Sequence, residues 1–171
     1  EQAEIAKKRK KLKKQSMNKA IIKAVLILLI CSVLGFFIWL TSYYAPTSEA
    51  ETYLKSDDAV TVSIDNNFIC FTPTNITPTK GFILYPAAKV DAKAYAKICK
   101  MISQQGYQVV AVDMPFNFSA FGKNKANEVM NKYNNIEHWV IGGDSLGGLV
   151  ATRYVNSKLD NIDGVVLISS Y

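Results

Sequence analysis

The most conspicuous pattern along the chain is one long apolar run near its start. Residues 21–40 read IIKAVLILLICSVLGFFIWL, with Lys23 as the one charge. At ~1.5 Å per residue, about 20 helical residues cross the ~30 Å hydrocarbon core of a bilayer. The run therefore predicts a transmembrane helix over 21–40. A cleaved signal peptide is the alternative, although no small-residue cleavage site follows closely.

After this run the hydrophobic periodicity changes twice. Residues 41–58 are polar, without a sustained period, and predict a linker that lifts a domain off the membrane. Alternating apolar and polar positions over 59–64 and 68–72 then predict an antiparallel hairpin. The helix expected over 91–105 places Tyr95, Ile98 and Ile102 on its apolar face, and places Lys93, Lys97 and Lys100 toward water.

The remaining pattern alternates strands with helices. Short apolar runs predict strands at 81–85, 107–113, 138–142 and 164–169, and helices are expected at 91–105, 124–133 and 146–157. Such alternation predicts an α/β fold with a mostly parallel sheet and helices on both faces. We expect residues 59–171 to form the N-terminal part of that domain, in a protein that continues beyond both ends of this chain.

Charge is concentrated at the start of the chain. The net charge is +6, yet residues 1–23 hold nine Lys or Arg against two Glu, while residues 24–171 hold eleven basic and twelve acidic side chains. A basic block beside an apolar span is a topology signal that also meets anionic lipid, and we expect no nucleic-acid partner. Residues 1–20 are then a cytoplasmic tail, and the domain lies outside the cell membrane.

The three cysteines predict no metal or redox site. Cys31 lies in the apolar run, and Cys70 and Cys99 have no CxxC-type spacing. Cys70 and Cys99 are either a disulfide or two buried thiols. We expect neither a metal nor an organic cofactor.

The strongest chemical signal is Gly143-Asp144-Ser145-Leu146-Gly147. This G-x-S-x-G pattern falls between a predicted strand and a predicted helix, as a nucleophile elbow requires. Gly143 and Gly147 leave room for the strand and helix to pack closely around a strained serine. We therefore predict Ser145 as a nucleophile.

A serine nucleophile also needs donors for an oxyanion. The elbow supplies the backbone N–H of Leu146, and the second donor is expected in the loop after the 81–85 strand. That loop reads Tyr85-Pro86-Ala87-Ala88-Lys89, and its small side chains leave the backbone open. Ala87 is the expected oxyanion-hole donor, with Ala88 as the alternative.

The segments GFILYPAAKVDAKAYA, GYQVVAVDMPFN, HWVIGGDSLGG and GVVLISSY resemble the dienelactone-hydrolase-like branch of the α/β-hydrolase superfamily. The resemblance covers roughly residues 60–171 and implies esterase-like chemistry. It also implies a triad acid and then a histidine beyond Tyr171, so this chain alone is expected to be inactive. Two departures are Asp144, where the pattern commonly has His, and Ala87-Ala88, where it often has Gly.

Three other titratable residues are poor triad candidates. His138, the one histidine, starts the strand that Ser145 ends and is expected to be structural. Asp113 is expected to shape its loop, and Asp144 is too close to Ser145 to orient a base.

The sequence thus predicts a membrane-anchored serine hydrolase acting on an ester or amide of a small or lipid-like acyl substrate. Two alternatives remain open, an inactive extracellular binding module and a cell-surface acyltransferase. The loop 114–125, with Phe116, Phe118 and Phe121, is either an apolar wall of the substrate site or packing.

Overall fold

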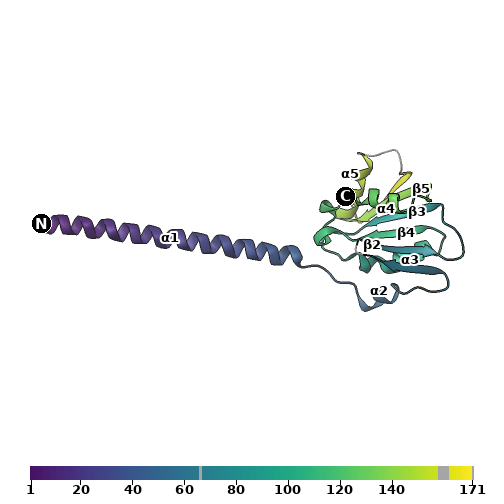
Figure 1. The fold of residues 1–171 in the computed structure, drawn as a ribbon, viewed down its shortest axis with the longest axis horizontal. Helices are drawn as coiled ribbons and strands as arrows, with labels where there is room; N and C mark the ends of the chain where they lie inside the picture. Colours follow the sequence, from purple (N-terminus) through teal and green to yellow (C-terminus); the bar gives the residue numbers. More distant parts are fainter. Residues whose placement is uncertain (66, 158–161, 171) are drawn as a thin grey trace. The chain divides into compact units, whose positions relative to one another are not determined.

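The computed structural model describes residues 1–65, 67–157 and 162–170. The chain divides into two compact units, Glu1–Ser42 and Tyr43–Tyr171. The first unit is one helix, and the second holds a six-stranded sheet (Figure 1).

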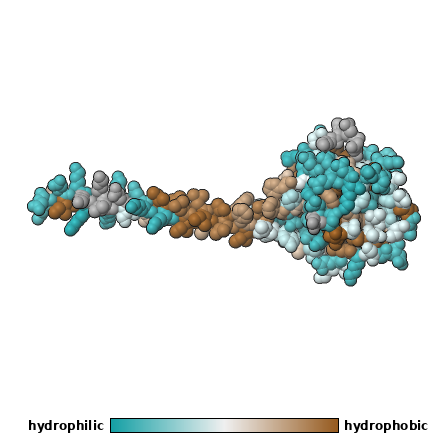
Figure 2. Space-filling model, viewed as in Figure 1, coloured by the Kyte–Doolittle hydropathy of each residue, from teal (hydrophilic) through white to brown (hydrophobic). Residues whose placement is uncertain are grey.

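The helix of the first unit, α1, runs from Gln2 to Thr41. It is longer than predicted because the basic segment continues the helix of the apolar one. Figure 2 shows a hydrophobic surface over its later part, where Ser16–Thr41 is long and apolar enough to cross a membrane, as some signal sequences also are. Ser42 is its C-cap: the Ser42 backbone is extended and leaves the helix, while its N–H still donates to the Ile38 carbonyl at 3.1 Å.

The sheet of the second unit has the strand order β1-β2-β4-β3-β5-β6. Its strands are β1 Val60–Ile64, β2 Phe68–Pro73, β3 Lys80–Tyr85, β4 Gln108–Val112, β5 His138–Asp144 and β6 Gly164–Ile168. β1 and β2 form the predicted antiparallel hairpin, and β2 is also antiparallel to β4. The pairs β3–β4, β3–β5 and β5–β6 are parallel, so the carboxyl ends of these four strands share one edge.

Helices cover both faces of this sheet, which confirms the predicted fold class. They are α2 Ser48–Thr52, α3 Ala96–Ser103 preceded by the 3₁₀ turn η1 Ala92–Tyr95, α4 Lys125–Lys132 and α5 Leu146–Val155. Successive side chains of β3 point to opposite faces of the sheet and so enter two different hydrophobic cores. Ile83 and Tyr85 pack with α4 and α5, and Phe82 and Leu84 pack with α3.

The two buried cysteines are separated by the sheet. Cys70 belongs to the core on the α4 and α5 side, and Cys99 belongs to the core on the α3 side. Both are free thiols, and burial raises the pKa of the Cys99 thiol. Of the two alternatives from the sequence, the structure has the buried thiols and not the disulfide.

Residues 43–58 pack on the domain, which corrects the predicted linker of 41–58. Tyr44 forms a parallel bridge with Val90, and Ala50 in α2 is buried. Thr47 caps α2, since its hydroxyl oxygen accepts from the Ala50 N–H at 3.2 Å. The polar composition that suggested a linker belongs instead to a short helix and its caps.

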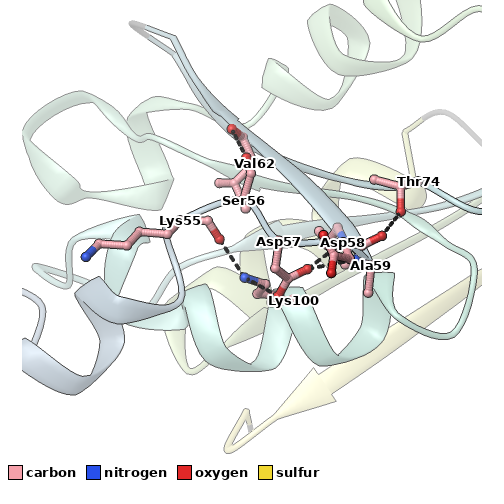
Figure 3. A network of polar contacts seen from close by, with 9 residues as sticks. Lys55, Ser56, Asp57, Asp58, Ala59, Val62, Thr74 and Lys100 are labelled. Carbon is pink, nitrogen blue, oxygen red and sulfur yellow. Dashed lines mark hydrogen bonds and ion pairs between the residues drawn. The ribbon is translucent and has the colours of Figure 1, made fainter.

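Lys100 holds part of this segment against α3 (Figure 3). Its ammonium lies 2.8 Å from a carboxylate oxygen of Asp57 and donates to the Lys55 carbonyl. The Lys100 side chain is 7% exposed, so the prediction that it points toward water is wrong. Asp57 in turn accepts from the Ala59 and Val60 N–H groups, which positions the start of β1.

Candidate active site

Ser145 is the single residue between the end of β5 and the start of α5, as the elbow pattern predicts. Its backbone has φ 49° and ψ −117°, a conformation that non-glycine residues rarely adopt. Such a residue costs on the order of 1–3 kcal/mol and needs support from its surroundings. Its N–H donates to the Ile168 carbonyl at 2.9 Å, and its side chain is exposed.

Two glycines let the strand, the turn and the helix approach this closely. A Cβ built on Gly143 would lie 2.3 Å from the Gly147 carbonyl carbon. A Cβ on Gly147 would lie 2.2 Å from the Tyr85 carbonyl oxygen and 2.4 Å from that of Pro86. The first turn of α5 therefore packs directly against the backbone where β3 ends.

The amino end of α5 supplies backbone donors beside Ser145. Leu146 is the first residue of α5, and the first N–H groups of a helix have no partner within it. The positive end of the helix dipole also favours negative charge there. This geometry suits the N–H of Leu146 to an oxyanion formed on a substrate of Ser145.

The loop 86–90 lies against this turn and is held by several hydrogen bonds. The Ser119 hydroxyl donates to the Pro86 carbonyl at 2.5 Å, and the Lys89 N–H donates to the Asn117 carbonyl at 2.6 Å. The Val90 N–H closes a turn on the Ala87 carbonyl at 3.3 Å, with Lys89 at φ 62°. Most of the loop backbone is thus fixed.

The two expected donors of this loop differ in their hydrogen bonding. The Ala87 N–H donates to the Tyr95 hydroxyl oxygen at 3.1 Å, so it is already engaged. Among the described residues, no acceptor is found for the Ala88 N–H. The Tyr95 hydroxyl donates in turn to a carboxylate oxygen of Asp144 at 2.8 Å. Sequence reasoning missed this role of Tyr95, which it placed only on an apolar helix face.

His138 lies far from Ser145. It occupies the first position of β5, and Ser145 follows the last, so the strand separates them by roughly 20 Å at ~3.3 Å per residue. Its Nδ1 lies 3.1 Å from a carboxylate oxygen of Asp163 on the exposed surface. Asp113 is at the carboxyl edge after β4, and its N–H donates to the Asn67 carbonyl at 2.9 Å.

Two hollows of the second unit do not include Ser145. One, of about 360 Å³, lies on the α3 face of the sheet and is apolar, with Phe82, Ile98, Ile102, Val140 and Val166 in its lining. The other, of about 430 Å³, surrounds His138 and Asp163 at the amino ends of the strands. The serine itself is open to solvent.

A family model described as "Alpha/beta hydrolase family" matches residues 81–171, just over half of the chain. The chain belongs to the alpha/beta hydrolase family. The match does not single out the dienelactone-hydrolase-like branch, which stays a prediction. A search of curated protein sequences finds no match.

Several solved structures share the fold of this alpha/beta hydrolase. A bacterial heroin esterase is 16% identical with a TM-score of 0.54, over 71% of this chain and 48% of its own. An esterase/lipase from an uncultured bacterium is 15% identical with a TM-score of 0.54, over 71% and 48%. A protein from Thermoplasma acidophilum described as a "predicted CIB-like hydrolase" is 19% identical with a TM-score of 0.52, over 66% of this chain and 63% of its own. The chain thus spans about half the length of the first two.

Proposed function

We propose that the complete protein is a membrane-anchored serine hydrolase that cleaves an ester or amide through an acyl-enzyme on Ser145. The observation that carries the proposal is the exposed Ser145 held at φ 49° between a parallel strand and a helix amino end. Strain of this kind clusters at functional sites, and no structural task of the Ser145 hydroxyl is evident among the described residues. Membership of the alpha/beta hydrolase family supports the same chemistry.

In the proposed mechanism, the Ser145 Oγ attacks the substrate carbonyl carbon while its proton passes to a histidine. That histidine and the acid that orients it belong to the expected part of the protein beyond Tyr171. The tetrahedral oxyanion accepts hydrogen bonds from the Leu146 N–H and from the loop 86–90. The leaving group takes the proton and departs, and water then releases the acyl group by the same steps.

Ala88 is the proposed second oxyanion donor in place of Ala87. The Ala87 N–H is engaged by Tyr95, whereas the Ala88 N–H has no acceptor among the described residues. Both lie in the loop that touches the first turn of α5 through Gly147. Removing a donor of this kind typically costs ~100-fold to 1000-fold in turnover.

The proposed acyl substrate is small and apolar or lipid-like. Phe116 and Phe121 expose 54% and 60% of their surface, and their rings meet edge to face with centroids 6.2 Å apart. Their loop is tied to the loop 86–90 through the Asn117 carbonyl and Ser119. Because Phe116 and Phe121 are not buried, substrate contact accounts for them better than packing does.

The proposed location is the cell membrane, with the N-terminus in the cytoplasm and the hydrolase domain outside. It rests on the length and composition of Ser16–Thr41 and on the basic residues before it. An anchored enzyme would stay with membranes after washing in high salt, whereas a cleaved signal peptide would release it.

Ester hydrolysis tests the proposed activity. Washed membranes containing the full-length protein are expected to hydrolyse p-nitrophenyl butyrate, and the Ser145→Ala variant should fall to background. Matched expression levels serve as the control. A wild-type protein that is folded but no faster than Ser145→Ala would contradict the proposal and favour a binding module. Acyl transfer to an added alcohol in preference to water would identify an acyltransferase.

A further inference from the structure

A chain of two hydrogen bonds connects the end of β5 to the loop after β3. Asp144, the residue before the nucleophile, accepts from the Tyr95 hydroxyl at 2.8 Å. The same hydroxyl oxygen accepts from the Ala87 N–H at 3.1 Å. These residues come from the nucleophile strand, the turn η1 and the loop 86–90, which are distant in sequence. Tyr95 thus connects the residue before Ser145 to the expected oxyanion loop.

The donors and acceptors in this chain have a single consistent order. A phenol has one proton, and here it is directed to Asp144, which leaves the oxygen lone pairs for the Ala87 N–H. Burial raises the pKa of Tyr95 above its ordinary value, so the hydroxyl keeps its proton. A hydrogen bond to a carboxylate is also stronger than one between neutral groups. Asp144 therefore fixes the direction of the Tyr95 hydroxyl.

Tyr95 in turn restricts the peptide that carries the Ala88 N–H. The Ala87 N–H on one side is held by Tyr95, and the Lys89 N–H on the other is held by the Asn117 carbonyl. The backbone has only two soft dihedral angles per residue. Fixing the Ala87 and Lys89 N–H groups therefore limits how the peptide group with the Ala88 N–H can rotate. Loss of the Tyr95 bond would release one side of this restraint.

We infer that Asp144 and Tyr95 are positioning residues, which hold the loop 86–90 in the orientation that serves catalysis at Ser145. This inference rests on the proposed function. It assigns Asp144 a task although its carboxylate does not orient a base. It also accounts for a carboxylate next to Ser145, close to where the substrate oxyanion would form, because this carboxylate is occupied by the hydrogen bond from Tyr95.

The test compares Tyr95→Phe with Tyr154→Phe in the full-length protein. Tyr154 also makes one side-chain hydrogen bond, to Asn127 at 2.6 Å, but it lies near the far end of α5. With p-nitrophenyl butyrate we expect Tyr95→Phe to lower kcat on the order of 10- to 100-fold with KM within about twofold, as loss of positioning does. Tyr154→Phe should keep the wild-type kcat.

Asp144 variants extend the test. Asp144→Asn keeps an oxygen that can accept from Tyr95 and should retain most of the wild-type kcat, whereas Asp144→Ala should resemble Tyr95→Phe. The double variant Tyr95→Phe, Asp144→Ala should be no slower than either single variant, since both remove the same restraint. Amide hydrogen exchange of the loop 86–90 should accelerate in Tyr95→Phe and not in Tyr154→Phe.

Three results would overturn the inference. They are wild-type kcat in Tyr95→Phe, an equal fall in kcat for Tyr154→Phe, and losses for Tyr95→Phe and Asp144→Ala that multiply in the double variant. A wild-type enzyme without Ser145-dependent hydrolysis would contradict the proposed function instead. In that case, amide exchange of the loop 86–90 in Tyr95→Phe that equals the wild-type rate would reject the positioning role as well.

Discussion

At the scale of single residues, backbone strain and close backbone contact define the candidate site. Ser145 adopts a positive φ, and Gly147 touches the carbonyl oxygens of Tyr85 and Pro86. Neither feature depends on a large side chain. Substitutions that add or remove only a Cβ therefore test both features directly.

Relief of strain at Ser145 can be measured as stability. Both Ser145→Gly and Ser145→Ala remove the hydroxyl, but only glycine adopts φ 49° without a steric penalty. We expect Ser145→Gly to exceed Ser145→Ala in free energy of unfolding by about 1 kcal/mol, after allowance for the greater freedom of glycine in the unfolded chain. Chemical denaturation in detergent measures this difference, and a more stable Ser145→Ala would contradict a strained elbow.

Gly147→Ala is expected to separate the loop 86–90 from the elbow. Its Cβ would clash with two backbone oxygens, which cannot move as a flexible side chain can. We expect a loss of about 1–3 kcal/mol in stability and a fall in kcat on the order of 100-fold. Gly164→Ala is the matched control, because its nearest neighbour is a Val140 methyl at 3.7 Å. Similar kcat values for the two variants would argue against close packing at Gly147.

At the scale of elements, the local patterns determined most of the strands and helices. The run GFILY became β3, and the strand–Gly-x-Ser-x-Gly–helix order became β5, Ser145 and α5. These features follow from residues that are neighbours in sequence. The parallel sheet and its helices on both faces then followed from their alternation.

The face of α3 that packs on the sheet was not evident from its pattern. Tyr95, Ile98 and Ile102 were expected on the apolar face, and Tyr95 and Ile102 do pack against the core on this side. Ile98, however, is 42% exposed, and the buried residues of α3 are Ala96, Cys99, Lys100 and Ser103. Small residues bring the helix close to the sheet, and the larger apolar ones border the groove beside it. Lys100 is buried because Asp57 and the Lys55 carbonyl come from a distant segment, which no local period reveals.

The two ion pairs of α3 should therefore differ in their effects. Lys97 and Glu49 are 53% and 67% exposed, whereas the Lys100 side chain is 7% exposed. We expect Lys100→Ala to lower the thermal midpoint by roughly 2–8 °C and Lys97→Ala to leave it nearly unchanged. Equal effects of the two substitutions would show that the Lys100 contacts do not hold residues 55–60 in place.

The ion pair of Lys100 and Asp57 also predicts that stability depends on pH. The pKa of Asp57 is lowered mainly by the hydrogen bond from Lys100. Hydrogen bonds from backbone N–H groups lower it further. A lowered folded-state pKa contributes stability above the unfolded value of about 4, and this contribution is lost as the pH falls through the folded value. The stability of Lys100→Ala should therefore fall less steeply in acid than that of the wild type.

At the scale of the whole molecule, the sequence separates an apolar helix from an α/β domain, and the structure divides at Ser42. The sequence did not reveal where the domain begins, since residues 43–58 are polar yet carry Tyr44 and Ala50 into contacts with the domain. Nor did it reveal that Tyr95 binds the Ala87 amide, because that bond depends on three segments meeting in space. The turn that carries Ser145 could be predicted from one motif, and the hydrogen bonds around it could not.

Covalent labelling shows whether Ser145 is an activated nucleophile. The full-length protein in membranes would be treated with a fluorophosphonate, which reacts with activated serines, and the modified peptide would be mapped by mass spectrometry, with Ser145→Ala as the control. We predict one adduct on Ser145 and none in the variant. A folded wild-type protein that forms no adduct, or forms it on another serine, would contradict Ser145 as the nucleophile.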